Sequence, residues 1–392
     1  MKNIVAITPD RDNYIEPIRE YLNLPLVFLR SYDWTELLSL KPALVIFLGD
    51  WKQTQVELIQ NCKKEKIPTV LVMDGTIEWK HFFENPKWSY GGNEAPYLPI
   101  YCDKVFVPGL STYRFLEFFG NSGKCAVTGL PRFDGYKNIQ KKQVKKPLTI
   151  GIISGNTAGY TKTQIAESVR LFEDIYHWAE GQKDIRVIYR LRKGFEDLLS
   201  VKIENDTSPS LAVFLEKTTA VISQPSTAAY EAMLLGIPTA IADYNIAPNY
   251  MSAAWRISSK EHIESVADEI VNPSKLKVLV QEQILNDTLS FIGSSAEVSA
   301  SIINKMIDSD NKAESSSFSN ETPKDLLVYE NASIQNMQTP IFANRTNYQF
   351  TDFELLEEEY IKLKVKNNEL NSALKRRGIG FWIELVINKI LK

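Results

Sequence analysis

The sequence predicts an α/β protein with two successive doubly wound parallel sheets and a C-terminal tail of different composition. Short apolar runs alternate with amphipathic stretches through residue 306, a pattern typical of parallel strands joined by helices. A polar and basic stretch, "NIQKKQVKKPLT" at 138–149, interrupts this alternation and is typical of an interdomain linker. From 307 to 345 the composition shifts to Ser, Asn, Asp, Glu and Gln, which is typical of a flexible tether.

The first domain, residues 1–140, contains short apolar runs that we interpret as strands, at 3–7, 26–30, 43–49, 69–75, 104–109 and 124–129. The stretches between them predict helices at 14–22, 34–38, 54–65 and 111–119. Several of the strands end in Gly or Asp. Because ligands of open α/β sheets bind beyond the carboxyl ends of the strands, these ends are expected to form a binding rim.

The second domain, residues 147–306, repeats the pattern. Strands are expected at 148–154, 185–192, 201–205, 220–224 and 239–242. Helices are expected at 162–180, 209–216, 260–271 and 274–306, with another that begins at Ser226 or Thr227.

The helix that begins at Ser226 or Thr227 lies in the stretch "QPSTAAYEAMLLGIPTAI", 224–241. It is apolar nearly all round, which is typical of a buried helix, and Glu231 is its one ionisable side chain. A capping box does not account for Glu231, because neither residue three positions after Ser226 and Thr227 is Glu or Gln. Since buried polar groups are satisfied, Glu231 is expected to meet either a ligand hydroxyl or a distant Lys, Arg or backbone amide.

Two segments resemble a known superfamily. The stretch "SQPSTAAYEAMLLGIPTAI" resembles the nucleotide-binding segment of sugar-nucleotide glycosyltransferases, non-hydrolysing UDP-N-acetylglucosamine 2-epimerases and CDP-glycerol glycerophosphotransferases. The stretch "CDKVFVPGLSTYRFLEFFG…KCAVTGLPRFDGY", 102–136, resembles the end of their first domain. The resemblance covers residues 1–305 and implies the GT-B fold, in which two Rossmann-like domains face a cleft. It implies an acceptor domain at 1–140 and a nucleotide-binding domain at 147–306.

The resemblance also implies a donor site. In those families a Ser or Thr opens the helix against the diphosphate, and a Glu within the helix often meets the ribose, which assigns these roles to Ser226, Thr227 and Glu231. The physical argument agrees, because a helix N-terminus attracts phosphate. Glu231 lies four residues after Thr227 and is therefore on the same helix face.

Further donor-binding candidates lie in two loops of the second domain. Gly155, Asn156 and Thr157 follow the strand at 148–154 and could offer backbone or side-chain groups to the donor. Arg190 and Arg192 end the next strand, and either could neutralise donor phosphate in place of a metal ion. The alternative for the two arginines is that they are solvated charges at a strand end. A histidine-proline pair that CDP-glycerol transferases tend to show in this region is absent.

A transferase of this kind needs a carboxylate in the first domain, as a base or a nucleophile. Asp74 and Glu78, in "MDGTIEWKHFFENPKW", are the expected catalytic residues, and Asp10 and Asp50 hold equivalent rim positions. The alternative is that a strand-end Asp only caps the next helix. A sugar-stacking wall is expected from the aromatic residues that follow, namely Trp79, Phe82, Phe83 and Trp88.

Composition excludes several classes of partner. A formal net charge of −3 gives no overall attraction to nucleic acid. Cys62, Cys102 and Cys125 are widely spaced and form no CxxC pair, so we expect no metal site and no disulfide, in a reducing cytosolic compartment. We expect no cofactor beyond the nucleotide-sugar itself. The N-terminus, "MKNIVAITPDRDNY", has no long apolar region before charged residues appear, so no signal peptide is expected. No run of about 18 apolar residues occurs, so no spanning helix is expected.

The tail carries two further patterns. Between 353 and 374 apolar residues recur at alternating spacings of 3 and 4, with Asn367 at a core position, which predicts a short coiled coil over 351–377 and a homodimer. An ordinary helix that packs on the body is the alternative. Residues 378–392 combine basic residues with Phe381, Trp382 and an apolar segment, which predicts an amphipathic helix on the membrane surface. Docking on a partner is the alternative for this segment.

These expectations combine into one function. They predict a metal-independent glycosyltransferase that moves a sugar from a nucleotide-sugar to a lipid-linked or surface-polysaccharide acceptor, peripheral on the cytoplasmic membrane face. The alternatives are a non-hydrolysing nucleotide-sugar 2-epimerase and a non-catalytic GT-B scaffold. The base of the donor, UDP-linked or CMP-linked, stays open.

Overall fold

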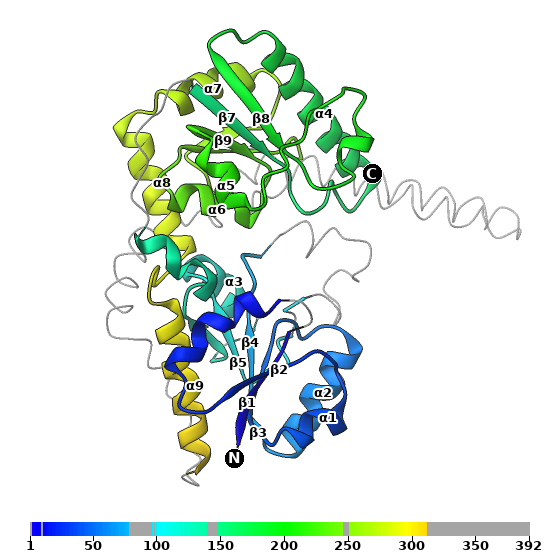
Figure 1. Ribbon diagram of the computed structural model, residues 1–392, viewed down its shortest axis with the longest axis vertical. Helices are drawn as coiled ribbons and strands as arrows, with labels where there is room; N and C mark the ends of the chain where they lie inside the picture. Colours follow the sequence, from blue (N-terminus) through cyan, green and yellow to red (C-terminus); the bar gives the residue numbers. More distant parts are fainter. Residues whose placement is uncertain are drawn as a thin grey trace, which may run out of the picture. The chain divides into compact units, whose positions relative to one another are not determined.

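The computed structural model describes residues 2–8, 11–77, 96–97, 99–118, 120–121, 123–138, 148–245 and 251–311. It contains two parallel sheets with helices packed on them (Figure 1). The expected pair of doubly wound sheets is therefore confirmed. Some predictions lie outside the described residues: Asp10, Glu78, the aromatic wall after Glu78, the coiled coil at 351–377 and the amphipathic helix at 378–392.

The first sheet has six strands in the order β2-β1-β3-β4-β5-β6, all parallel. Their bounds are β1 Asn3–Ile7, β2 Leu26–Leu29, β3 Pro42–Phe47, β4 Thr69–Val72, β5 Lys104–Val107 and β6 Cys125–Val127. Each lies within the apolar run that predicted it, apart from Pro42 at the start of β3. The central strand β4 is buried along its whole length, because helices cover both faces of such a sheet.

The helices of the first sheet are α1 Trp34–Ser39, α2 Gln53–Lys64 and α3 Leu110–Phe118, close to their predicted ranges. The helix predicted at 14–22 is instead two 3₁₀ segments, η1 Asp12–Tyr14 and η2 Glu16–Tyr21. Pro17 near the start of η2 has no N–H to donate to a preceding carbonyl, which prevents one continuous α-helix.

The second sheet has five parallel strands in the order β11-β10-β9-β7-β8. Their bounds are β7 Leu148–Ile153, β8 Ile185–Arg190, β9 Ala220–Ser223, β10 Thr239–Ala242 and β11 Trp255–Ile257. The strand predicted at 201–205 is wrong, since only Asn205 makes an isolated bridge, to Tyr189. The Asn205 side chain bonds both the N–H and the carbonyl of Leu191, which replaces the ladder of a strand. Strand β11 was not predicted from the sequence.

Helices α4 Lys162–Glu180, α5 Leu211–Glu216, α6 Thr227–Leu234 and α7 His262–Val271 pack on the second sheet, and a short 3₁₀ segment, η5 Glu196–Leu198, follows β8. Helix α4 has the predicted bounds. Its start is fixed by a capping box, in which Gln164 N donates to Thr161 Oγ1 at 3.2 Å and Thr161 N donates to Gln164 Oε1 at 3.3 Å.

The single helix predicted at 274–306 is two helices, α8 Lys275–Thr288 and α9 Ser295–Asn311. The break is stabilised by Asp134, whose carboxylate accepts the N–H groups of Gly293, Ser295 and Ala296 at 3.0, 2.9 and 2.7 Å. After the break α9 packs beside the first sheet, in a core shared with β1 and β3 (Figure 1). Residues 295–306 therefore pack with the first sheet, although their sequence position grouped them with the second domain.

None of the helices in these described ranges is long and apolar enough to cross a membrane.

Candidate functional site

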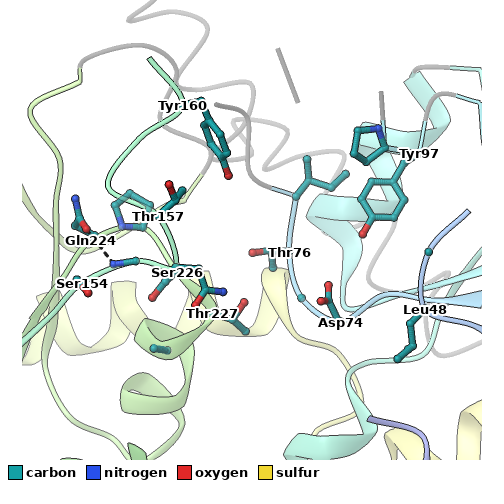
Figure 2. A pocket seen from close by; sticks show the side chains of 18 of the residues that line it. Leu48, Asp74, Thr76, Tyr97, Ser154, Thr157, Tyr160, Gln224, Ser226 and Thr227 are labelled. Carbon is teal, nitrogen blue, oxygen red and sulfur yellow. Dashed lines mark hydrogen bonds between the residues drawn. The ribbon is translucent and has the colours of Figure 1, made fainter. Parts of the chain in front are cut away.

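A cavity of about 780 Å³ lies between the carboxyl ends of the strands of the two sheets. The loops after β3 and β4 line one wall, and the loop after β7 together with the start of α6 lines the other (Figure 2). The walls approach closely at Gly75, where an added Cβ would lie 2.6 Å from Thr227 Oγ1. Only glycine at position 75 leaves Thr227 undisturbed.

Most of the predicted site residues line this one cavity: Asp74, Gly155, Asn156, Thr157, Ser226, Thr227 and Glu231. They come from positions far apart in the sequence. Within each parallel sheet the strands end on one edge and deliver their loops there, and loops from both sheets line this cavity.

The N-terminus of α6 faces the cavity. Ser226 precedes the helix in an extended conformation with φ −163° and ψ 159°. Within the described part of the chain its side chain makes no capping hydrogen bond to α6. The first turn of α6 therefore keeps the positive end of its dipole, and the Ser226 and Thr227 hydroxyls, available to an anion in the cavity.

The loop after β7 is held by a glutamine that sequence reasoning missed. Gln224, 7% exposed, accepts the N–H of Gly155 at 2.9 Å through Oε1 and donates from Nε2 to Ser168 Oγ at 3.1 Å. Gly155 therefore shapes the loop rather than offering its N–H to a ligand. Asn156 is exposed at the cavity, and the Thr157 hydroxyl bonds the backbone of Gly159.

Glu231 meets two distant side chains. Tyr136 donates its hydroxyl to Oε2 at 2.8 Å, and Arg132 Nη1 lies 3.5 Å from Oε1. Both belong to the segment η4 Pro131–Asn138, within the stretch that resembled the end of a first domain. Burial, followed by the Glu231 carboxylate, raises the pKa of Tyr136 well above its ordinary value, so the hydroxyl stays protonated and donates. Glu231 keeps 15% of its side chain exposed and still lines the cavity.

Arg132 was not predicted as a site residue, although "GLPRFDGY" was singled out. Its guanidinium lies 4.9 Å from the ring of Tyr14 and 4.2 Å from that of Phe133. Nη2 donates to the Asp74 carbonyl at 3.3 Å. Arg132 thus joins the end of β4 to Glu231 on α6, and it lines the cavity.

Helix α6 presents one face to the first domain. Thr227, Tyr230 and Glu231 lie on this face, because residues three and four apart are neighbours on a helix. The Tyr230 hydroxyl, on a side chain that is 2% exposed, hydrogen-bonds with Thr76 and Thr288. The same helix therefore carries the candidate phosphate site and the contacts with the first domain.

Asp74 lies on the opposite wall from the tip of α6 (Figure 2). Its Oδ2 accepts from Arg11 Nη1 at 2.6 Å, and the two side chains are 37% and 54% exposed. Arg11 also lines the cavity and was not predicted. The Asp74 carboxylate, paired with Arg11, remains part of the cavity lining.

The two predicted arginines do not line the cavity. Arg190 donates to the Ser208 carbonyl at 2.9 Å and lies 3.9 Å from Asp206. The Arg192 side chain is exposed, and only its backbone N–H reaches inward, to Ser154 Oγ at 2.7 Å. Arg190 is thus engaged within its own domain, and Arg192 fits the alternative of a solvated charge.

Asp50, at the end of β3, is fully buried and does not line the cavity. Its Oδ2 accepts the N–H of Tyr101 at 2.7 Å, whereas Oδ1 is buried with no hydrogen-bond partner among the described residues. Burial raises the pKa of the Asp50 carboxyl from about 3.8 to about 6. Asp50 therefore serves the structure of the first domain.

The variant Asp50→Asn should gain stability relative to the unsubstituted protein as pH rises. Between pH 3.8 and 6 the folded state binds the Asp50 proton more tightly than the unfolded state, so the contribution of this group to stability falls as pH rises through that window. The difference in unfolding free energy should shift by up to about 3 kcal/mol in favour of the variant. Urea unfolding at pH 4, 5, 6 and 7 measures it, and a difference that does not change with pH would contradict the shifted pKa.

In the described ranges no group of three or more His, Cys, Asp and Glu side chains is placed to hold a metal ion. No family model matches the sequence, and no curated protein matches it.

Several solved structures match the fold. MnaA of S. aureus, solved with UDP, matches with a TM-score of 0.55 at 15% identity, over 79% of this chain and 97% of that one. UDP-GlcNAc 2-epimerase from Neisseria meningitidis, bound to UDP-GlcNAc, matches with a TM-score of 0.53 at 16% identity, over 78% and 100%. The wall teichoic acid polymerase TagF, with CDPG, matches with a TM-score of 0.51 at 13% identity, over 79% and 90%. The chain has the GT-B fold that these proteins share.

Proposed function

We propose that this protein is a glycosyltransferase that moves a sugar from a nucleotide-sugar to a glycan or lipid-linked acceptor. One observation carries the proposal: the tip of α6 and the carboxylate of Asp74 face each other across a single cavity. Transfer of a sugar from a phosphate leaving group requires two parts: a site that binds the phosphates, such as a helix N-terminus, and a group that accepts or donates a proton.

The proposed donor pose follows from the geometry. The diphosphate lies at Ser226 and Thr227, where the first turn of α6 supplies N–H groups and hydroxyls. The ribose lies against Glu231, whose carboxylate accepts its hydroxyl protons. The sugar then extends toward the wall that carries Asp74, since this wall comes within contact distance of Thr227 at Gly75.

Two arginines suit a leaving diphosphate. Arg11 and Arg132 both line the cavity, and each carries a fixed positive charge that can offset the charge on the departing phosphates. This is the support for a transfer in which side chains rather than a metal ion neutralise the donor. Asp74 acts as the base that takes the proton of the acceptor hydroxyl as the new glycosidic bond forms.

The competing enzyme reaction is 2-epimerisation of a nucleotide-sugar. It is favoured by two of the similar structures, which are a UDP complex of MnaA and a UDP-GlcNAc 2-epimerase. A scaffold without activity is less well supported, because Glu231 and Arg132 keep charged groups partly exposed to the cavity.

The acceptor and the location are proposed from the tail. Basic and apolar residues at 378–392 suit the surface of an anionic membrane, and the repeat at 353–374 suits a homodimer. A lipid-linked acceptor at the cytoplasmic face would bring its sugar to an enzyme held there.

Nucleotide binding is the first test. We expect one of UDP, CMP, CDP, GDP and ADP to raise the melting temperature, equally with and without a divalent cation, because binding to the folded state alone stabilises it. Incubation with the matching nucleotide-sugar in D₂O then separates the enzymes: a transferase releases the nucleotide only with an acceptor, whereas a 2-epimerase places deuterium at C2 without one. No shift with any nucleotide, in folded protein, would move the assignment to a scaffold.

A further inference from the structure

Tyr97 lines the cavity on the first-domain side and has a backbone conformation that side chains rarely adopt. Its φ is 65°, in the left-handed region that favours glycine. A bulky residue stays in such a conformation only where its surroundings hold it, and residues of this kind cluster at functional sites. The structure therefore has to show both what holds Tyr97 and what the strain achieves.

Asn121 holds the backbone of Tyr97 through a buried hydrogen bond. Its side chain, 3% exposed, donates from Nδ2 to the Tyr97 carbonyl at 3.2 Å. Its Oδ1 accepts the N–H of Ile100 at 3.1 Å. One buried amide thus bonds both the Tyr97 carbonyl and the Ile100 N–H, which ties the backbone of Tyr97 to the core of the first domain.

Two charged side chains hold the next residues. Asp50, fully buried, accepts the N–H of Tyr101 at 2.7 Å, and Lys124 donates Nζ to the Ile100 carbonyl. Burying a carboxyl group and half-burying an ammonium group is unfavourable for folding. Their placement along one short segment indicates that the position of this segment matters more than its stability.

The hydrogen bonds with Asn121, Asp50 and Lys124 hold the backbone so that the ring of Tyr97 lines the cavity. Figure 2 shows the Tyr97 hydroxyl directed toward the side on which Asp74 lies, across the cavity from Ser226 and Thr227. Trp51 packs edge to face against the ring, with centroids 5.3 Å apart and an interplanar angle of 66°. Both aromatic residues line the cavity on the side of the candidate base, Trp51 half-buried and Tyr97 with 9% of its surface exposed.

Tyr32 adds an oriented hydroxyl to the same wall. Gln55 Oε1 accepts the N–H of Lys52 at 3.1 Å, which fixes the amide so that Nε2 donates to the Tyr32 oxygen at 3.1 Å. A phenol that accepts one hydrogen bond still has its own hydrogen to donate. The wall therefore combines aromatic faces with a hydroxyl donor.

We propose that Tyr97, Trp51 and Tyr32 form the subsite for the pyranose ring of the donor, with Asn121 as a positioning residue for Tyr97. The proposal rests on the proposed function, because it places the phosphates at α6. A pyranose fits this chemistry, since its C–H face is apolar and its edge carries hydroxyl groups. The donor sugar is the ring assigned to this wall, because the aromatic side chains line the same cavity as Asp74, and the neighbouring Gly75 lies close to Thr227 at the tip of α6.

The test compares a bare nucleotide with its sugar-linked form. In calorimetry, Tyr97→Leu and the unsubstituted protein should bind the nucleoside diphosphate with the same affinity. Tyr97→Leu should bind the glucose- or N-acetylglucosamine-linked form about tenfold more weakly than the unsubstituted protein does. Asn121→Ala should reproduce this pattern, and Tyr97→Phe should restore most of the affinity for the sugar-linked form. Tyr113→Leu is the matched control, since it removes a ring that packs on the same core but does not line the cavity.

Three results would overturn the subsite. Equal loss of affinity for both ligands would mean that the ring stacks on the base or only supports the fold, and no loss for either would mean that the donor sugar lies elsewhere. A loss in Tyr113→Leu as large as in Tyr97→Leu would also indicate a structural effect. Failure of the proposed function gives a different result, because the unsubstituted protein would then bind no nucleotide.

In that case saturation-transfer NMR with methyl glucoside tests the subsite by itself. A saturation-transfer signal from the sugar that is as strong with Tyr97→Leu as with the unsubstituted protein would contradict the subsite.

Discussion

Replacing Glu231 by Ala is expected to weaken nucleotide binding by about 10-fold to 100-fold, the largest binding effect that the structure indicates. A hydrogen bond to a charged group contributes about 1.5 to 3 kcal/mol, and the carboxylate is the proposed acceptor for the ribose hydroxyls. Calorimetric titration with the nucleotide that raises the melting temperature measures the loss. A variant that binds this nucleotide as tightly as the unsubstituted protein would reduce Glu231 to a structural partner of Arg132.

A control has to separate the loss of the Glu231 carboxylate as a ligand contact from the loss of its contacts with Arg132 and Tyr136. Glu231→Ala also leaves Arg132, 17% exposed, without its carboxylate, which should lower the unfolding free energy by about 3 kcal/mol. Tyr136→Phe keeps the carboxylate and removes only the 2.8 Å hydrogen bond that orients it. We expect this variant to lose less than about tenfold in affinity, since one neutral donor contributes about 1 kcal/mol.

Replacing Asp74 by Asn is expected to lower kcat by about 10²-fold to 10⁴-fold, the usual contribution of a positioned acid or base. The nucleotide affinity should stay within about twofold, because Asp74 lies on the wall opposite the tip of α6. Initial rates of nucleotide release in the presence of acceptor, together with calorimetry, measure the two quantities separately.

Arg11→Gln tests the ion-pair partner of Asp74. It breaks the 2.6 Å ion pair and removes a charge proposed to offset the leaving diphosphate, so it should weaken nucleotide binding as well as lower kcat, whereas Asp74→Asn should lower kcat alone. Full activity in Asp74→Asn would transfer the role of base to another carboxylate, and Glu78 is the next residue that the sequence suggests. Loss of nucleotide binding together with activity would show that Asp74 supports the fold of the cavity rather than the chemistry.

The sequence was most informative where one local rule decides the structure. Parallel strands are buried on both faces, so their apolar runs stand out, and each strand of the first sheet lies in or beside the run that predicted it. Helix α4 has its predicted start because Thr161 and Gln164 form a capping box. The stretch at 201–205 forms no strand, since the Asn205 side chain, rather than a strand backbone, pairs with the backbone of Leu191.

The candidate site was predictable in part for the same reason. Loops after the strands of one parallel sheet meet at one edge, which placed Asp74 on the rim of the first sheet and Thr157 in a loop of the second. The resemblance to GT-B proteins then implied that both face one cleft. Arg190 and Arg192 looked equally suitable in the sequence. Whether such a side chain turns toward the cavity depends on the pairing partners nearby, and Arg190 found Asp206 in its own domain.

The sequence by itself predicted two doubly wound sheets, a helix that begins at Ser226 or Thr227, and a carboxylate, Glu231, that required a partner. Only the tertiary structure supplied that partner, because Tyr136 and Arg132 lie about a hundred residues from Glu231 along the chain, and local patterns carry no information on such contacts. The return of α9 to the first sheet and the strained Tyr97 were likewise decided by packing between distant segments.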